Sequence, residues 1–185
     1  MIEKDPNEPL RFKFVGDLFL GGEFIPYAEK TRTGILQPFQ NVTGHLKDCD
    51  VLFINLEGPI FRGPDKRSDV TALLSNHPSI LNFLNSHKHC ILNLANNHIM
   101  DYGTEGMLQT ISLLRENNLN YVGAGSNEEE ANRELVVECK GRRISFISYT
   151  TDERHVRAII AGPNRPGCAT YLDLERVLAR IRELK

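Results

Sequence analysis

The chain has 185 residues, 41% of them hydrophobic, which is enough for one domain with a buried core. Its 24 acidic and 22 basic residues give a formal net charge of −2, and it has no basic stripe interleaved with aromatic side chains, so the sequence does not predict binding to nucleic acid. No apolar run has the length of a transmembrane helix, and the N-terminus lacks the basic and apolar regions of a signal peptide. We therefore expect a cytoplasmic protein with no transmembrane segment in this chain.

The first half of the chain predicts strands that alternate with helices. Strands are expected at residues 11–16, 51–55 and 90–94, and the last two are continuous apolar runs typical of buried strands. A helix at residues 78–86 precedes the third strand. Residues 18–44 show no clear period and are expected to be irregular, with at most a short helix.

The second half turns from a βα order to a hairpin. Its expected elements are, in order, a helix at 104–117, a strand at 120–123, a short helix beginning near Asn127, a hairpin of strands 134–139 and 143–149, a long loop at 151–169 and a final helix at 172–184. This order predicts an α/β (α+β) fold with a mixed β-sheet flanked by helices.

Polar side chains follow three of the predicted strands directly. They are, in chain order, Asp17, then Asn55 with Glu57, and then Asn96, Asn97 and His98 with Asp101. If these strands are parallel neighbours, their ends lie ~5 Å apart per strand, so the side chains converge at the edge where α/β sheets bind ligands. Carboxylate, amide and imidazole groups hold divalent metals and transfer protons. For an isolated Asn-Asn-His segment the alternative is a polar turn that caps the next helix.

The same residues carry a resemblance to a known family. The segments concerned are Gly16-Asp17 with Gly21-Gly22, Asn55-Leu-Glu-Gly-Pro59, Ala95-Asn-Asn-His-x-x-Asp-Tyr-Gly103 with Glu105-Gly106, Thr110-x-x-x-Leu114, Tyr121-Val-Gly-Ala-Gly125, Glu130-Ala131 and Ile147-Ser-Tyr149. In this order they resemble the bacterial capsule synthesis protein CapA family, which includes the PgsA-type proteins of poly-γ-glutamate biosynthesis. The resemblance covers about residues 11–150 of what we expect to be one CapA-like domain, residues 1–185.

The resemblance implies a fold related to the calcineurin-like metallophosphoesterases, a β-sandwich flanked by helices around a two-metal site. It places Asp17 at the first carboxylate ligand, Glu57 at the metal-bridging carboxylate and Asn97 at the amide ligand. It makes His98 the histidine that faces the reacting group. Asp101 is then expected either to fix the tautomer of His98 or to interact with the dipole of the next helix.

Two parts of the family pattern are missing. Phe19 stands where the phosphoesterase pattern has a histidine ligand. Family members also continue with a His-Trp-Gly-type and a Gly-His-x-x-His-type segment, but this chain has no Trp and matches neither. We therefore expect a domain truncated at its C-terminus. Its final helix, with an apolar face, would either lead into a further strand or pack as a terminal cap.

Further candidates for substrate contact are Asn55, Asn96 and two arginines, Arg62 and Arg67, in the loop after Glu57. That loop is read either as a solvated loop or as a flap over an anionic substrate. The expected partner is an anionic small molecule or a polyglutamate-type polymer, with no nucleic acid, and an open strand edge would allow a homo-oligomer. Four cysteines without paired or metal-type spacing are consistent with a reducing compartment, although members of the family are often found at the cell envelope.

Two functions therefore stay open. The first is a metal-dependent hydrolase of capsule or poly-γ-glutamate biosynthesis, in which Mn, Fe or Zn, as one ion or two, activates water. The second is a non-catalytic accessory domain that lacks a complete metal centre and holds no metal.

Overall fold

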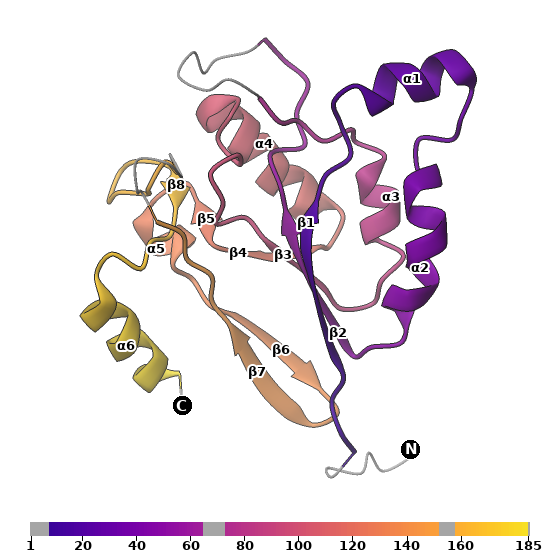
Figure 1. Cartoon of the computed structure of the whole chain (residues 1–185). Helices are drawn as coiled ribbons and strands as arrows, with labels where there is room; N and C mark the ends of the chain where they lie inside the picture. Colours follow the sequence, from indigo (N-terminus) through magenta and orange to yellow (C-terminus); the bar gives the residue numbers. More distant parts are fainter. Residues whose placement is uncertain (1–7, 65–72, 152–157, 185) are drawn as a thin grey trace.

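The centre of the molecule is a parallel four-stranded sheet (Figure 1). The computed structural model describes residues 8–64, 73–151 and 158–184. The strands are β1 (Phe12–Leu18), β2 (Val51–Leu56), β3 (Cys90–Asn93) and β4 (Asn120–Val122), and they lie side by side in this order. Together with helices and antiparallel strands elsewhere, the sheet confirms the predicted mixed α/β fold.

One face of this sheet packs against helices. α3 (Ile80–Leu84) and α4 (Gly103–Glu116) contribute the buried side chains of Ile80, Phe83, Leu84, Met107, Ile111 and Leu114. They form one hydrophobic cluster with alternate residues of β2 and β3, including Leu52, Ile54 and Leu92. The other residues of the same strands point to the opposite face, as the period of two requires.

Residues 18–44, expected to be irregular, contain more helix than the sequence indicated. They form α1 (Phe24–Thr31), the 3₁₀ helix η1 (Gln37–Phe39) and the start of α2 (Gln40–Lys47). α1 fully buries only Ala28, and α2 fully buries no residue. Each of these two α-helices is only 8 residues long, and Pro26 in α1 and Gly44 in α2 are poor helix formers, so the local sequence does not indicate a helix clearly.

A β-hairpin covers the second face of the sheet. Its strands are β6 (Leu135–Cys139) and β7 (Arg142–Phe146), and Val137 and Phe146 pack against the sheet residues Val51, Ile91 and Val122. The turn residues Lys140 and Gly141 both have positive φ, 50° and 75°, as tight two-residue hairpins require. The predicted hairpin is therefore confirmed.

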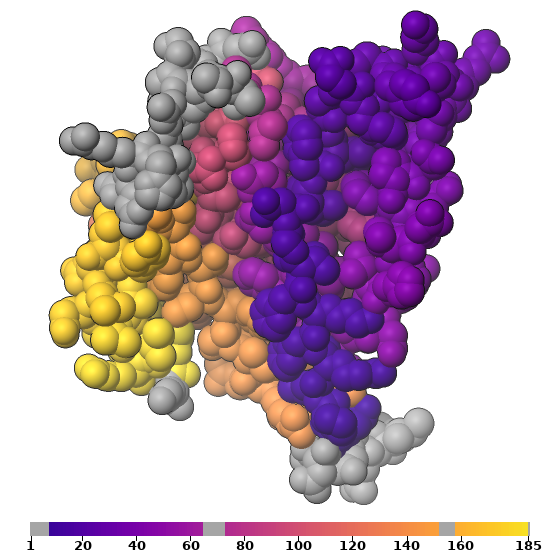
Figure 2. Space-filling model, in the orientation of Figure 1, coloured from indigo at the N-terminus to yellow at the C-terminus, as the bar shows by residue number. Residues whose placement is uncertain are grey.

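The hairpin leaves the outer strand β1 at the surface, where the indigo part of the chain is seen in Figure 2. The ring of Phe14 packs at a tilt against Phe53 of β2, which in turn stacks on Phe146 of the hairpin. Even so, Phe14 is 67% exposed and Phe12 beside it is 38% exposed. The second layer of the fold is thus complete over β2 but not over β1.

The C-terminal part wraps round the end of the sheet. β5 (Ala124–Gly125) pairs with β8 (Gly167–Cys168), so the stretch 151–169 is not wholly a loop. The short helix α5 (Glu128–Ala131) follows Asn127, whose side chain caps it. α6 (Leu174–Glu183) fully buries no residue, and its Leu174 is 61% exposed. The apolar face predicted for this helix is therefore not packed in a core.

No helix in the described ranges combines the length and the apolar character needed to cross a membrane. All four cysteines are free thiols.

Candidate functional site

Three polar residues lie in register across the sheet at the carboxyl ends of its strands. Asp17 of β1 pairs with Asn55 of β2, and Asn55 pairs with Asn93 of β3. The register of β1 shifts by one residue between Val15 and Asp17. Because one extra residue reverses the side to which the following side chains point, this bulge brings Asp17 onto the face that carries Asn55.

Asn55 joins the two predicted carboxylate ligands. Its side-chain Nδ2 donates to Oδ1 of Asp17 at 2.8 Å and to Oε2 of Glu57 at 2.6 Å. The two carboxylates, on different strands, therefore bind the two hydrogens of one amide group. This geometry brings Asp17, Asn55 and Glu57 together at the strand ends.

A buried asparagine fixes the loops that follow β1 and β2. The side chain of Asn76 accepts from the backbone N–H of Leu20 and donates to the carbonyl oxygens of Glu57 and Gly58. Gly58 has φ = +82°, and a Cβ there would lie 3.0 Å from Leu74. The turn after Glu57 thus needs glycine for two reasons, its positive φ and this close approach.

One ring nitrogen of His98 faces Glu57, and the other binds the carboxylate of Asp101. The Nδ1 of His98 lies 2.7 Å from Oδ2 of Asp101, which also accepts from the backbone N–H of Leu74 at 2.8 Å. With a carboxylate as its partner, Nδ1 carries the hydrogen, so Nε2 presents either a lone pair or a second proton. This Nε2 lies 3.8 Å from Oε1 of Glu57.

The site is short of positive charge. Neither Asp17 nor Glu57 forms an ion pair with a lysine or arginine in the part of the chain that the structure describes. Burial raises the pKa of Glu57 above its usual range, and the charge of Asp17 adds to this, whereas the hydrogen bond from Asn55 opposes it. The surroundings of Glu57 therefore favour a bound proton or another cation.

Asn96 and Asn97, neighbours in the loop after β3, differ in their contacts. Asn96 is 7% exposed. Its Oδ1 accepts from the backbone N–H groups of His98 and Ile99. Its Nδ2 donates to Oδ1 of Asn55 and to the carbonyl oxygen of Leu56. These bonds occupy its side-chain amide inside the protein, which leaves little of it for the predicted contact with substrate. Asn97 is half-buried, and its side chain has no hydrogen-bond partner within the described ranges.

Of the two arginines expected to contact substrate, only Arg62 is described by the structure, and it does not join this cluster. Arg62 is exposed and forms no ion pair with Asp17 or Glu57 among the described residues. Burial and, less strongly, the charge of Arg62 lower the pKa of His77. Arg67 lies outside the described residues.

The donor set fits one divalent cation in chemical type. The carboxylates of Asp17 and Glu57 lie together without a lysine or arginine partner among the described residues, and the amide oxygen of Asn97 is a third donor of suitable type, whereas Nε2 of His98 is left for a proton. For a second ion, Phe19 supplies no donor where the resemblance expects histidine. Among residues 8–64, 73–151 and 158–184, no three His, Cys, Asp or Glu side chains are grouped so that they could hold a metal ion by themselves. In the site, the amide of Asn55 lies between the two carboxylates.

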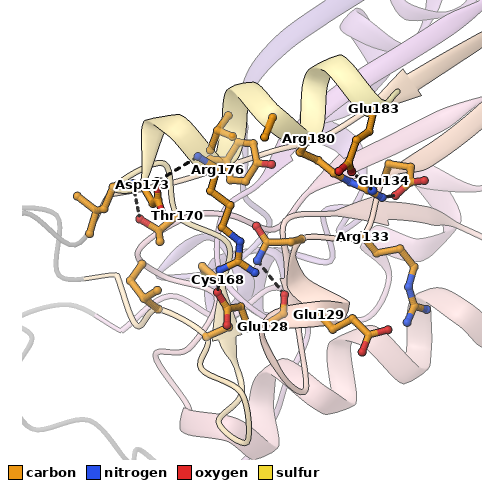
Figure 3. A pocket seen from close by; sticks show the side chains of 17 residues that line it. Glu128, Glu129, Arg133, Glu134, Cys168, Thr170, Asp173, Arg176, Arg180 and Glu183 are labelled. Atoms are coloured by element: carbon orange, nitrogen blue, oxygen red, sulfur yellow. Dashed lines mark hydrogen bonds and ion pairs between the residues drawn. The ribbon is translucent and has the colours of Figure 1, made fainter. Parts of the chain in front are cut away.

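A cavity of about 810 Å³ lies elsewhere, between α5, β8 and α6 (Figure 3). Its charged walls pair with one another, as Arg176 does with Glu128 and Arg180 with Glu134. At its floor, Cys168 donates to the carbonyl oxygen of residue 96 at 3.4 Å, and burial raises the pKa of this thiol to about 12. Cys168 is therefore a neutral thiol that hydrogen-bonds to the loop after β3. None of the predicted site residues line this cavity.

Comparison with known proteins agrees with the motifs at the strand ends. The sequence profile of the family described as bacterial capsule synthesis protein PGA_cap matches residues 11–185. The chain belongs to this family.

Three bacterial relatives support the assignment. The chain is 30% identical over 169 residues to the capsule biosynthesis protein CapA of Bacillus anthracis, which covers 90% of this chain and 40% of that protein. It is 29% identical over 165 residues to the PGA biosynthesis protein CapA of Bacillus subtilis, 87% of this chain and 42% of that protein. A probable polyglutamine synthesis accessory protein of Mycobacterium tuberculosis is 32% identical over 120 residues, 64% of this chain and 32% of that protein. The chain thus spans about two fifths of the length of the two CapA proteins.

Proposed function

We propose that this member of the capsule synthesis family acts in the biosynthesis of a capsule or poly-γ-glutamate polymer through a hydrolase-type site at the carboxyl edge of its sheet. The names of the two CapA relatives, capsule and PGA biosynthesis proteins, support the process. The hydrolase-type chemistry is supported by the polar cluster, whose single most telling contact is that of His98 with Glu57.

In that contact two electron-rich atoms face each other, Nε2 of His98 and Oε1 of Glu57, 3.8 Å apart. With a neutral imidazole and an ionised carboxylate, both atoms present lone pairs and repel. A proton or a metal cation between them removes the repulsion. The pair is therefore suited either to passing a proton or to holding a cation, and a hydrolase with a metal-activated water needs both abilities.

The cation in this proposal is a single divalent Mn, Fe or Zn ion held by Asp17, Glu57 and Asn97. When bound, such an ion polarises the scissile group and makes its water a better nucleophile at neutral pH. His98 donates or accepts the proton at Nε2, and Asp101 keeps its Nδ1 protonated. The substrate is an anionic small molecule or a polyglutamate-type polymer.

Metal analysis of the purified chain after incubation with Mn²⁺ or Zn²⁺ tests this proposal. We expect bound metal to be lost in Asp17→Ala and retained in Asp48→Ala, a control in which an exposed carboxylate outside the site is removed. We also expect little turnover of simple aryl phosphates, because one ion cannot hold both the attacking and the leaving oxygen as a two-metal centre does. Robust metal-stimulated turnover that disappears in His98→Ala would instead indicate a complete two-metal phosphoesterase.

A second function is favoured by the missing donors. Phe19 and the absence of a ready cage among the described residues are expected of an accessory domain that supports polymer synthesis without catalysis. The purified protein would then bind no metal, and Asp17→Ala would be indistinguishable from the unmodified protein.

A further inference from the structure

The hydrogen bonds that reach Asp17 and Glu57 through three asparagine side chains, Asn93, Asn96 and Asn55, all have the same donor-to-acceptor direction. Side-chain amides have a donating and an accepting end, and only their partners tell which end points where. Here the partners include backbone groups, whose roles as donors or acceptors are fixed.

The first anchor is the backbone N–H of Ala95. It donates to Oδ1 of Asn93 at 2.8 Å, and the hydroxyl of Ser148 donates to the same oxygen at 2.5 Å. Since its Oδ1 is committed, Asn93 must turn its NH₂ group toward Asn55, and Nδ2 donates to Oδ1 of Asn55 at 2.8 Å.

The second anchor is independent of the first. Asn96 accepts from the N–H groups of His98 and Ile99, so its NH₂ group must point the other way, to the carbonyl oxygen of Leu56 at 2.8 Å and to Oδ1 of Asn55 at 3.2 Å. Two separate chains of bonds thus deliver a donor to the carbonyl oxygen of the Asn55 side chain.

We infer that Asn55 is the positioning residue of the carboxylate pair, and that Asn93 and Asn96 fix its amide so that both hydrogens point at Asp17 and Glu57. Asn55 needs no contact with substrate for this role. The inference deepens the proposed function, and it rests on that function only where metal binding is concerned.

The two oxygens of each carboxylate therefore have different roles. Asn55 occupies Oδ1 of Asp17 and Oε2 of Glu57. It leaves Oδ2 of Asp17 and Oε1 of Glu57 for a cation, and the latter oxygen is the one that faces His98. A group that holds metal ligands in this way typically changes metal affinity about 10- to 100-fold when it is removed.

The test is nuclear magnetic resonance of the side-chain amide of Asn55 in ¹⁵N-labelled, metal-free protein. Each of its two hydrogens binds a different carboxylate, so we expect Asp17→Asn to shift one of the two proton signals and Glu57→Gln to shift the other. If both substitutions leave both signals unchanged, or if the two signals have the positions and fast exchange of a solvent-exposed amide, the inference is wrong.

Asn93→Asp tests how the orientation is fixed. The substituted side chain keeps the shape of asparagine but presents an oxygen to Oδ1 of Asn55, so one of the two donors that hold this amide is lost and its proton signals should shift, although Asn96 still holds the amide from the other side. Asn117→Asp is the matched control, because it alters a similar asparagine pair, with Asn85, at the surface. If Asn93→Asp does not fold, Ser148→Ala should give a smaller shift of the same signals. Asn55 signals that are unchanged in both variants would overturn the role of Asn93.

Titration with Zn²⁺ separates this inference from the proposed function. We expect Asn55→Ala to weaken Zn²⁺ binding at least about tenfold, whereas Asn117→Asp leaves it unchanged. If the unmodified protein binds no Zn²⁺, the metal-dependent function fails, and the amide signals still decide the positioning role. If Zn²⁺ binds equally well to Asn55→Ala, the positioning role toward the metal ligands is rejected.

Discussion

The Nε2 atom of His98 lies 3.8 Å from Oε1 of Glu57, across a gap between two side chains that come from the ends of neighbouring strands. Asp101, which is completely buried, binds the other nitrogen of the ring. The histidine therefore has one nitrogen fixed by the protein and one turned toward the carboxylate, and this asymmetry can be tested on each side of the ring.

Replacing Asp101 by Asn should disturb both the tautomer of His98 and the stability of the fold. The neutral amide accepts less strongly than the carboxylate from Nδ1 and from the N–H of Leu74, so the fraction of His98 protonated at Nδ1 should fall. We expect the free energy of unfolding to drop by about 1–3 kcal/mol. The ¹⁵N shifts of the imidazole and thermal unfolding measure the two effects. Unchanged ring shifts would show that Asp101 does not set the tautomer.

Glu57→Gln should stabilise the metal-free protein at neutral pH. Burial raises the pKa of Glu57, so the folded state binds its proton more tightly than the unfolded state. The stability that this proton contributes is fully present below the usual pKa of 4.5 and is lost as the pH rises through the raised value.

The variant should therefore gain on the order of 1 kcal/mol at pH 7 in the presence of a chelator, with no gain below about pH 4. Urea unfolding at several pH values measures this, and Glu175→Gln, at an exposed position of α6, serves as the control. A variant that is less stable than the unmodified protein at pH 7 would contradict the conclusion that the surroundings of Glu57 favour its protonated form.

The two middle strands of the sheet, β2 and β3, could be predicted from the sequence because they are largely buried on both faces. Val51–Leu56 and Cys90–Asn93 are nearly continuous apolar runs, and the polar residues at their ends indicate the carboxyl edge of the sheet. The helices α1 and α2 could not be predicted, because each is only 8 residues long and contains a poor helix former, Pro26 in α1 and Gly44 in α2.

The hydrogen-bond network around the site could not be predicted from the sequence either. Asn93 lies inside an apolar run, and its partner Ser148 is 55 residues away in the chain. Asn76, which fixes the loops after β1 and β2, has no local sequence signal either. Such residues become recognisable only when the strands are placed side by side, since their partners are distant in sequence.

Phe14→Ser should reduce self-association of the chain if the uncovered strand β1 forms contacts between copies. Phe14 is largely exposed on an edge strand, and edges with apolar side chains recruit further strands. Sedimentation velocity over a range of concentrations measures the effect, with Val42→Ser, another exposed apolar residue, as the control. A concentration-independent monomer of the unmodified protein would reject the expectation of a homo-oligomer.

The double substitution Arg176→Gln with Arg180→Gln should loosen α6 without destabilising the core. This helix buries no residue fully, and two ion pairs, Arg176 with Glu128 and Arg180 with Glu134, tie it to the rest of the protein (Figure 3). Exposed ion pairs contribute up to about 1 kcal/mol each, so amide exchange in α6 should accelerate up to about 30-fold. Arg182→Gln on the same helix is the control, and equal exchange in both variants would show that the ion pairs do not hold α6.

The most direct test of the proposed site is calorimetric titration of the metal-free chain with Mn²⁺ or Zn²⁺. We predict about one bound ion per chain, as expected for a set of two carboxylates and an amide. Binding should disappear in the double variant Asp17→Asn with Glu57→Gln and persist in Asp48→Asn. No binding to the unmodified chain, or equal binding to the double variant, would contradict the claim that the carboxyl edge of the sheet is a cation site.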